Sequence, residues 1–201
     1  MIAIIDYDAG NLKSVEKALN SLGHETVVSR DSSVILEADK VILPGVGSFG
    51  DAMNNLDHFG LIDTIKKVAA SKTPFLGICL GLQLLFERSD ETPGAEGLSI
   101  LPGQILRIPP SNDLKIPHMG WNSLKFYDDN PLFNGTAEGQ YVYFVHSFFA
   151  KCNEGLSATC DYGIEVTAAV RKNNVFGMQF HPEKSGEVGL NILKQFELYN
   201  G

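Results

Sequence analysis

Cysteine is scarce in this sequence, which has three cysteines among 201 residues: Cys79, Cys152 and Cys160. An odd number of widely spaced cysteines, without a CxxC pair, indicates neither a disulfide framework nor a zinc site. We therefore expect no bound metal and no cofactor. Cys152 and Cys160 are most simply unpaired residues of strands or turns.

Basic residues and long hydrophobic runs are also lacking. Lysine and arginine number 16 against 24 aspartates and glutamates, a net charge of -8. This balance argues against a nucleic-acid or anionic-membrane surface, because phosphate binding needs clustered basic residues. The longest apolar stretch, residues 78–86, is too short to span a bilayer and contains Gln83. With no leader-like basic and apolar segment at the N-terminus, we expect a cytoplasmic protein.

Internal repeats, low-complexity segments and linkers rich in Pro, Gly or Ser are absent as well. A chain of this length can bury a large core without disulfides or metals. The sequence thus predicts a single domain over residues 1–201.

The first half of the chain alternates between strand-like and helix-like segments. Residues 2–5, HETVVS at 24, KVILP at 40 and PFLGI at 74 are typical of strands, and helical patterns lie between them, over 12–22 and over 49–70 with a break at Gly60. Such alternation predicts a mostly parallel sheet with flanking helices, and sites in such sheets form beyond the carboxyl ends of strands.

After Pro93 the pattern changes to short β-rich runs. The runs are QILRI at 104, YVYFVHSFF at 141, EVTAAV at 165 and NVFGMQF at 174. They are separated by turns rich in Gly, Asn and Asp, and a last helical pattern covers 188–199. The prediction is therefore an α/β fold, with a mixed, mostly parallel central sheet and a β-rich C-terminal half.

The clearest local motif is Gly-x-Cys-x-Gly, formed by Gly77, Cys79 and Gly81. It joins the strand-like PFLGI to a helix-like segment that runs through Phe86, which is the form of a nucleophile elbow. Small residues on either side allow a sharp turn, and the amide of Leu80 would be free to donate. The alternative is an ordinary buried cysteine in a strand.

A reactive cysteine needs a base and a group that orients the base. His181 ends the NVFGMQF strand and is followed by Pro182 and Glu183, so a carboxylate lies two residues from the imidazole. We therefore predict Cys79, His181 and Glu183 as a triad. A surface turn that happens to read His-Pro-Glu is the alternative, and His118 and His146 also remain candidates for a role in a site.

An oxyanion hole usually combines the amide after the nucleophile with one from a neighbouring strand-end loop. Leu80 and the Gly45-Val46 segment meet that description. The alternative for PGVG at 44 is a simple tight turn. A phosphate loop is a weaker reading, because the lysine and the spacing of a Walker motif are missing.

These motifs resemble those of class I (triad type) glutamine amidotransferases. Three ordered motifs carry the resemblance: PGVGSFG at 44, GICLGLQLLFE at 77 and FHPEKS at 180. It implies a flavodoxin-like α/β fold and hydrolysis of L-glutamine to glutamate and ammonia. It further implies that Cys79 attacks the side-chain amide, that His181 moves protons, that Glu183 orients His181, and that a γ-glutamyl thioester forms.

The same resemblance implies substrate contacts. Gln83 matches a substrate-contacting glutamine, and Glu91 matches an acidic residue that can meet the substrate ammonium. The segment His146-Ser147-Phe148 resembles one whose backbone binds the substrate carboxylate. For Gln83 a polar helix flank, and for Glu91 a solvated loop carboxylate, remain alternatives.

Within the family, the opening DYDAGNLKSV and the segment IPHMGWNSL at 116 are similar to glutaminase subunits of histidine biosynthesis. These subunits form a heterodimer with a (β/α)8-barrel cyclase that uses the ammonia to make imidazole glycerol phosphate and an aminoimidazole carboxamide ribonucleotide. The resemblance places four residues near the cyclase: Asn11, Met119, Trp121 and Lys184. Trp121 as a core aromatic and Lys184 as a solvated charge are the alternatives.

Three other functions stay open. A glutaminase could serve pyridoxal phosphate, anthranilate or aminodeoxychorismate synthesis, although PHMGWN weighs against this. A γ-glutamyl thiol hydrolase could use the same triad, and a non-enzymatic interaction protein could share the fold. We also expect low glutaminase activity in isolation, because the glycines at 45 and 47 allow the loop to rotate its peptides.

Overall fold

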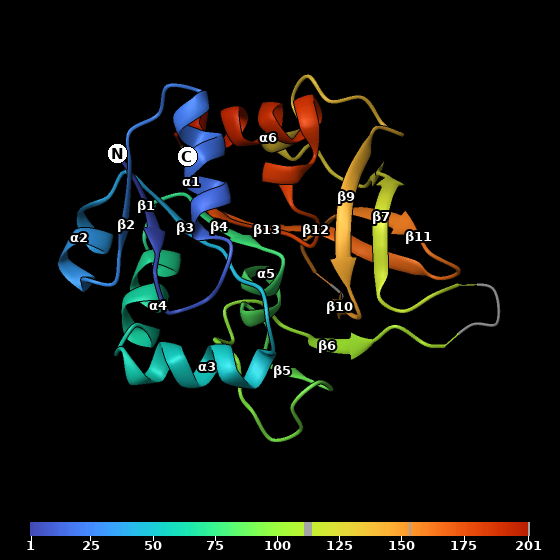
Figure 1. The fold of residues 1–201 in the computed structure, drawn as a ribbon, viewed down its shortest axis with the longest axis horizontal. Coiled ribbons are helices and arrows are strands. Elements are labelled where there is room, and N and C mark those ends of the chain that lie inside the picture. Colours follow the sequence, from blue (N-terminus) through green and yellow to red (C-terminus); the bar gives the residue numbers. More distant parts are fainter. Residues whose placement is uncertain (111–113, 153, 201) are drawn as a thin grey trace.

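The computed structural model describes residues 1–110, 114–152 and 154–200, and its centre is a mixed eight-stranded sheet (Figure 1). Across the sheet the strands follow the order β2 (Thr26–Ser29), β1 (Ile2–Ile5), β3 (Lys40–Leu43), β4 (Phe75–Ile78), β13 (Val175–Met178), β12 (Glu165–Lys172), β11 (Leu156–Asp161) and β8 (Lys125–Phe126). Neighbours from β2 to β13 are parallel, and those from β13 to β8 are antiparallel. The predicted fold class is confirmed.

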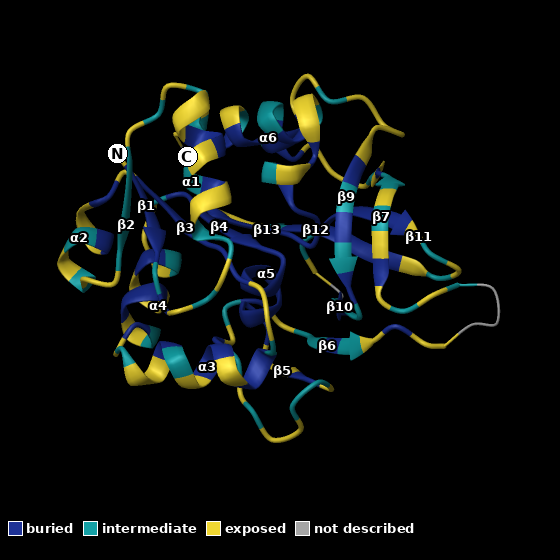
Figure 2. Ribbon diagram, viewed as in Figure 1, coloured by how far each residue is buried: buried dark blue, intermediate teal, exposed yellow. Residues whose placement is uncertain are grey.

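The parallel strands are apolar throughout because both faces of the sheet are covered. In β1, Ile2 and Ile4 pack into one hydrophobic cluster, whereas Ala3 and Ile5 pack into the other. This is the two-residue alternation of a strand with both faces buried. Figure 2 shows the central strands and the inner sides of the helices as buried.

Helices cover the two faces of the sheet (Figure 1). One face carries α1 (Leu12–Ser21) and α6 (Gly186–Leu198), and the other carries α2 (Ser32–Glu37), α3 (Phe49–His58), α4 (Ile62–Ala70) and α5 (Leu80–Leu84). The helix expected to reach Phe86 ends at Leu84, and α2 was not predicted. Among the described helices, none has the length and hydropathy to cross a membrane.

Two small sheets flank the central one. The first joins β5 (Arg88–Ser89), β6 (Gln104–Arg107) and β10 (Phe148–Lys151), and the second pairs β7 (His118–Ser123) with β9 (Tyr141–His146). Short 3-10 helices, η1 (Pro131–Phe133) and η2 (Pro182–Lys184), precede α6. The run YVYFVHSFF, expected as one strand, breaks at Ser147 and contributes to both small sheets.

This arrangement brings distant segments to one edge of the central sheet. The strands β3, β4 and β13 are parallel neighbours, so their carboxyl ends lie side by side. The loop at 44–47, Cys79 and the segment leading to His181 follow these three ends. Sites of open α/β sheets form at this edge, as the sequence predicted.

Candidate active site

Cys79 occupies a sharp turn between β4 and α5. Its backbone has φ 55° and ψ −108°, a conformation that costs free energy in a residue with a side chain. A Cβ added to Gly81 would lie 1.8 Å from the Leu43 carbonyl oxygen, and one added to Gly77 would lie 2.7 Å from the Gly81 oxygen. Only glycine permits this close approach of strand and helix, so the motif forms the predicted elbow.

His181 and Glu183 lie beyond the end of β13, and their side chains are fully buried. The Nδ1 atom of His181 donates to Glu183 Oε1 at 2.7 Å, and both side chains have no exposed area. This bond fixes the tautomer and leaves Nε2 without another hydrogen-bond partner among the described residues. Burial alone lowers the pKa of His181, but the Cys79 sulfur and Glu183 outweigh it and raise the pKa to about 9.

The backbone of β9 fixes the position of His181. The amide of His181 donates to the Tyr143 carbonyl at 2.9 Å. The hydroxyl of Ser185 donates to the His181 carbonyl at 2.6 Å and accepts from the Tyr143 amide at 2.9 Å. Strand β9 therefore sets the place of the imidazole, a contact that the sequence did not predict.

Asn11 contacts the same carboxylate. Its side-chain amide donates to Glu183 Oε1, the oxygen that also accepts from His181. Asn11 lies in the left-handed region, at φ 78°, at the N-terminal end of α1. The sequence placed Asn11 near a partner and missed this contact, which joins residues 172 positions apart.

The oxyanion elements are in place, but the Leu80 amide is not free. It donates to the carbonyl oxygen of Gly45 at 3.3 Å, and the hydroxyl of Tyr7 donates to the Pro44 carbonyl at 2.8 Å. The prediction of a free Leu80 amide is therefore wrong for this structure. The reason is that the peptide between Gly45 and Val46 presents its oxygen, not its N–H, to the elbow.

A pocket of about 360 Å³ opens beside the cysteine. Its lining joins the predicted substrate residues to the elbow: Val46, Gly47, Cys79, Leu80, Gln83, Glu91, Pro117, Val145, His146, Ser147 and Phe148. A cavity of this size accommodates a small molecule. Gly45 lies outside the lining, since its carbonyl is turned to Leu80.

Gln83 and Glu91 are held by the protein itself. The side-chain amide of Gln83 donates to the Phe148 carbonyl at 3.0 Å and to Gln179 Oε1 at 3.1 Å. Glu91 Oε2 accepts from the Phe49 amide at 2.7 Å, at the start of α3. Gln83 thus stabilises the pocket wall through its hydrogen bonds. Glu91 is held at the edge of the pocket by the Phe49 amide, so it is not a freely solvated carboxylate.

Gln179 was missed by the sequence reasoning. It is fully buried, and its side-chain amide lies 3.9 Å from Cys79 Sγ, which it meets as a donor. The available signal was a polar residue at the end of an apolar strand, two positions before His181. The interpretation of NVFGMQF as a plain strand concealed it.

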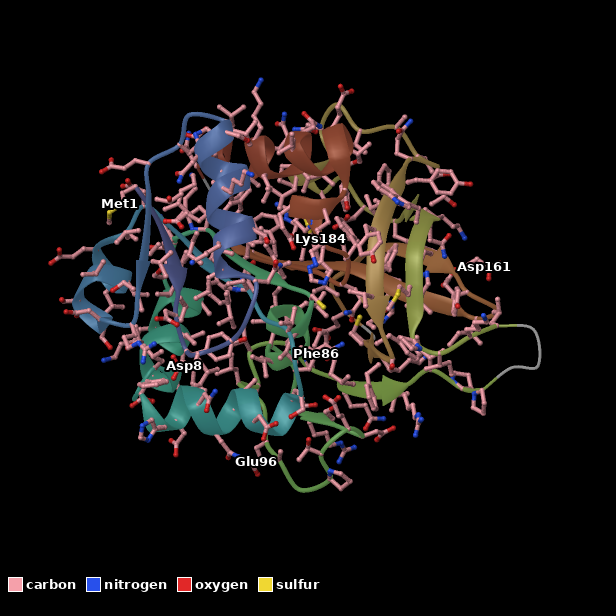
Figure 3. The ribbon with its side chains drawn as sticks, in the orientation of Figure 1. Met1, Asp8, Phe86, Glu96, Asp161 and Lys184 are labelled. Atoms are coloured by element: carbon pink, nitrogen blue, oxygen red, sulfur yellow. The ribbon has the colours of Figure 1, made fainter. Side chains whose placement is uncertain are left out.

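Three of the four predicted partner residues are exposed, and Asn11 is half-buried. Met119 and Trp121 on β7 are 61% and 55% exposed, so Trp121 is not a core aromatic. Tyr141 on β9, which the sequence did not single out, is 57% exposed. Lys184 is also exposed, and it lies in η2 between α1 and β9 in Figure 3. The chain thus presents exposed apolar side chains on β7 and β9, and Lys184 follows Glu183 in η2.

A second cavity, at the other edge of the sheet, lacks this chemistry. A cavity of about 620 Å³ lies at the opposite edge of the sheet, against Met1, Lys40 and Glu197. It is larger than the pocket at Cys79 but contains no nucleophile with a paired base. Within residues 1–110, 114–152 and 154–200, no group of three or more His, Cys, Asp or Glu side chains is placed to hold a metal ion.

Comparison with known proteins identifies the family. The family described as "Glutamine amidotransferase class-I" matches residues 3–198. The chain is 52% identical over 198 residues to "Imidazole glycerol phosphate synthase subunit HisH" of Bacillus cereus (strain G9842), covering 98% of this chain and 94% of the relative. It is 49% identical over 197 residues to the protein of the same description in Methanothermobacter thermautotrophicus, covering 98% and 97%.

Solved structures show the same fold. A crystal structure of a glutamine amidotransferase aligns with a TM-score of 0.75 at 18% identity, covering 98% of this chain and all of that one. PurLQS from Thermotoga maritima aligns with a TM-score of 0.73 at 22% identity, covering 100% and 98%. The chain belongs to the class-I glutamine amidotransferase family.

Proposed function

We propose that this chain is the glutaminase subunit of imidazole glycerol phosphate synthase and works in histidine biosynthesis. The observation that carries the proposal is sequence identity: the chain is about 50% identical, over 98% of its length, to subunits of that enzyme. The whole chain acts as one domain, in the cytoplasm. It hydrolyses L-glutamine to glutamate and ammonia, and it works in a complex with a partner subunit.

Cys79 is the nucleophile in this proposal. Its sulfur attacks the side-chain amide carbon of glutamine, and the proton of the thiol passes to His181 Nε2. His181 then gives a proton to the departing nitrogen, so ammonia leaves and a γ-glutamyl thioester remains. Water attacks the thioester with His181 as base, and glutamate and the free thiol are released. Nε2 has no other hydrogen-bond partner among the described residues. The pKa of about 9 favours the imidazolium near neutral pH, so the proton taken from the thiol stays on Nε2 and is available for the departing nitrogen.

Glu183 orients the base. Its bond to Nδ1 at 2.7 Å fixes the ring with Nε2 available on the other side. The carboxylate also stabilises the imidazolium that forms during attack. Gln179, at 3.9 Å from the sulfur, helps to hold the thiol in place.

The oxyanion hole forms by rotation of one peptide. The Gly45 carbonyl now accepts from Leu80, so the developing negative charge would face an oxygen. A rotation of the Gly45-Val46 peptide would free the Leu80 amide and turn the Val46 N–H toward the pocket. Glycine at 45 and 47 keeps such a rotation sterically accessible. The free chain is therefore a weak glutaminase, and the partner shifts the loop to its donating form.

Glutamine occupies the 360 Å³ pocket. The backbone of His146-Ser147-Phe148 binds its carboxylate, and Glu91 meets its ammonium. Gln83 shapes the pocket by holding the Phe148 carbonyl. The side-chain amide of the substrate then reaches Cys79 at the elbow.

The partner is a (β/α)8-barrel cyclase, and it docks on the exposed face that carries Met119, Trp121 and Lys184. Asn11 links this side of the molecule to Glu183. Ammonia passes to the cyclase, which forms imidazole glycerol phosphate and an aminoimidazole carboxamide ribonucleotide. The net charge of -8 fits a substrate nucleotide that is held by the partner and not by this chain.

A glutaminase assay tests the proposal. Glutamate release is measured for the purified chain alone, with the cyclase, and with the cyclase and its nucleotide ligand. Cys79→Ala is the blank, and Cys152→Ala is the matched control because Cys152 lies outside the pocket. We expect stimulation by the loaded cyclase, no activity in Cys79→Ala and normal activity in Cys152→Ala. Cleavage of γ-glutamyl peptides without a partner, or stimulation only by another acceptor enzyme, would overturn the proposal.

A further inference from the structure

Two buried histidines form a hydrogen-bonded pair beside the pocket. His118 Nδ1 lies 2.9 Å from His146 Nε2, and His146 Nδ1 lies 2.8 Å from the Phe148 carbonyl oxygen. A carbonyl oxygen only accepts, so His146 carries its hydrogen on Nδ1. His146 Nε2 is then the acceptor, and His118 must carry its own hydrogen on Nδ1. The geometry fixes both tautomers.

Asn122 completes the chain of donors. Its side-chain nitrogen lies 3.3 Å from His118 Nε2 and 2.8 Å from the Asp161 carbonyl oxygen. Its side-chain oxygen accepts from the Ser123 amide at 2.8 Å. These bonds fix the orientation of the amide, so Nδ2 donates to His118. Donation thus runs in one direction, from Asn122 through both histidines to Phe148.

The pair is neutral, and its surroundings keep it so. His118 stacks on Tyr162 and Phe144, with ring centroids 3.9 and 4.7 Å away. Burial lowers the pKa of His118 to about 4, and burial, together with charge on His118 and His181, lowers that of His146 to about 3. A proton added to either ring would place two N–H groups face to face.

The pair lies on the inner face of two strands whose outer face is exposed. In the register of β7 with β9, His118 is opposite His146, and Trp121 is opposite Tyr143. Alternation along β7 therefore turns His118 and Asn122 inward and Met119 and Trp121 outward. The proposed partner surface and the histidine pair therefore lie on opposite faces of the two-stranded sheet of β7 and β9.

We propose that His118 is a positioning residue for the glutamine pocket. Through His146 it holds the carbonyl of Phe148, and thereby the 146–148 segment, in the conformation that receives the substrate. The Phe148 carbonyl also accepts from Gln83. The 146–148 segment is thus fixed from β7 on one side and from α5 on the other. This inference rests on the proposed function and deepens it.

The kinetics of two substitutions test the positioning role. His118→Phe keeps a ring against Tyr162 and Phe144 but removes the donor to His146. With the loaded cyclase present, we expect the KM for glutamine to rise about tenfold and kcat to change less than about threefold. His118→Asn restores a donor near the position of Nδ1 and should bring the KM back to within about threefold of the wild type.

Val142→Ala is the matched control, because Val142 packs on the same inner face but belongs to no part of the donor chain. It should lower stability and leave the KM within about twofold. An unchanged KM in His118→Phe, or an equal rise in Val142→Ala, would overturn the proposal. If His118→Phe does not fold, Asn122→Leu removes the donor to His118 Nε2 and should raise the KM in the same direction.

Nitrogen NMR of the wild-type histidines tests the geometry without any activity. His118 and His146 should each show hydrogen on Nδ1, with Nε2 unprotonated, and neither should titrate between pH 5 and 9. A hydrogen on His146 Nε2, or titration of either ring in this range, would overturn the inference. A wild-type chain that shows the two tautomers but never hydrolyses glutamine would instead overturn the proposed function.

Discussion

The backbone amide of Leu80 donates to the carbonyl oxygen of Gly45 at 3.3 Å. The Leu80 amide is the first proposed donor of the oxyanion hole, and the Val46 amide is the second. In this structure the loop that carries Val46 instead accepts the hydrogen bond of Leu80. The hydroxyl of Tyr7 reinforces this state through its bond of 2.8 Å to the Pro44 carbonyl, one residue earlier. Rotation of the Gly45-Val46 peptide would break the Leu80 bond, and we propose that this bond, with Tyr7 anchoring the preceding peptide, restrains the glutaminase.

Tyr7→Phe should raise the basal glutaminase rate. A typical intramolecular hydrogen bond contributes about 0.5–1.5 kcal/mol, so its loss should favour loop rotation by about two- to thirteenfold. Glutamate release by the free chain measures the effect. Tyr127→Phe is the control, because its hydroxyl bonds to Glu165 far from the loop. A basal rate equal to that of the wild type would show that Tyr7 does not restrain the loop.

Asn11→Ala should reduce kcat through Glu183. The amide of Asn11 shares Oε1 with His181, so its loss leaves the carboxylate held by one donor at that oxygen. Hydrogen bonds to charged groups contribute about 1.5–3 kcal/mol. If all of this free energy is lost in the transition state, kcat falls by about ten- to a hundredfold, which is the largest effect we expect. Steady-state kinetics with the loaded cyclase measure it.

Asn11→Asp separates this effect from simple loss of packing. A second carboxylate beside Glu183 repels it, so we expect a larger fall in kcat that eases at lower pH, as one carboxyl group takes up a proton. Lys184→Ala is the control, since Lys184 is exposed and adjacent to Glu183 in sequence. Its substitution should weaken binding of the cyclase and leave kcat at saturating cyclase within about threefold. Equal effects of Asn11→Ala and Lys184→Ala on kcat would contradict a role through Glu183.

The free energy of unfolding should fall as the pH rises from about 6.5 to 9. The pKa of His181 is raised from 6.5 to about 9 in the folded chain, so the folded state holds this proton more tightly than the unfolded state. The resulting stabilisation is complete below pH 6.5 and is lost as the pH passes 9, at about 3 kcal/mol in total. Urea unfolding at a series of pH values measures it.

His181→Gln should abolish most of this slope. Cys79→Ala should reduce it, because the sulfur is one of the groups that raise the pKa of His181. His58→Gln serves as the control, since His58 is exposed at the end of α3. A slope that is unchanged in His181→Gln would assign the pH dependence to other groups.

The sequence allowed the central sheet, and the position of Cys79 and His181 at one edge of it, to be predicted for a physical reason. Both faces of the parallel strands are buried, so their apolar runs are distinct, and their carboxyl ends must meet at one edge. Cys79 and the His181-Pro-Glu183 turn follow two of those ends directly. Because the two strands are neighbours in the sheet, Cys79 and His181 lie close together.

The rest depends on contacts that leave no local pattern. Strand β7 was missed because its pattern is reversed. In an ordinary half-buried strand the apolar residues face the core, whereas in β7 the apolar Met119 and Trp121 are exposed and the polar His118 faces inward. The contact of Asn11 with Glu183 joins distant segments and requires the folded chain. Whether the Leu80 amide is free depends on the orientation of one peptide at Gly45, which glycine does not restrict.

Trp121 should report docking of the cyclase, because it is the chain's single tryptophan and is 55% exposed on β7. Burial against the partner would remove its ring from water, so its emission should shift to shorter wavelength in a saturable titration. Aromatic residues at the centre of interfaces often dominate binding, and we expect Trp121→Ala to weaken the complex by about ten- to a hundredfold. Tyr127→Ala removes another exposed aromatic ring and should leave the affinity within about threefold. Calorimetric titration of both variants compares them directly. Unchanged emission on binding, together with equal affinities, would place the cyclase on a different face of the molecule.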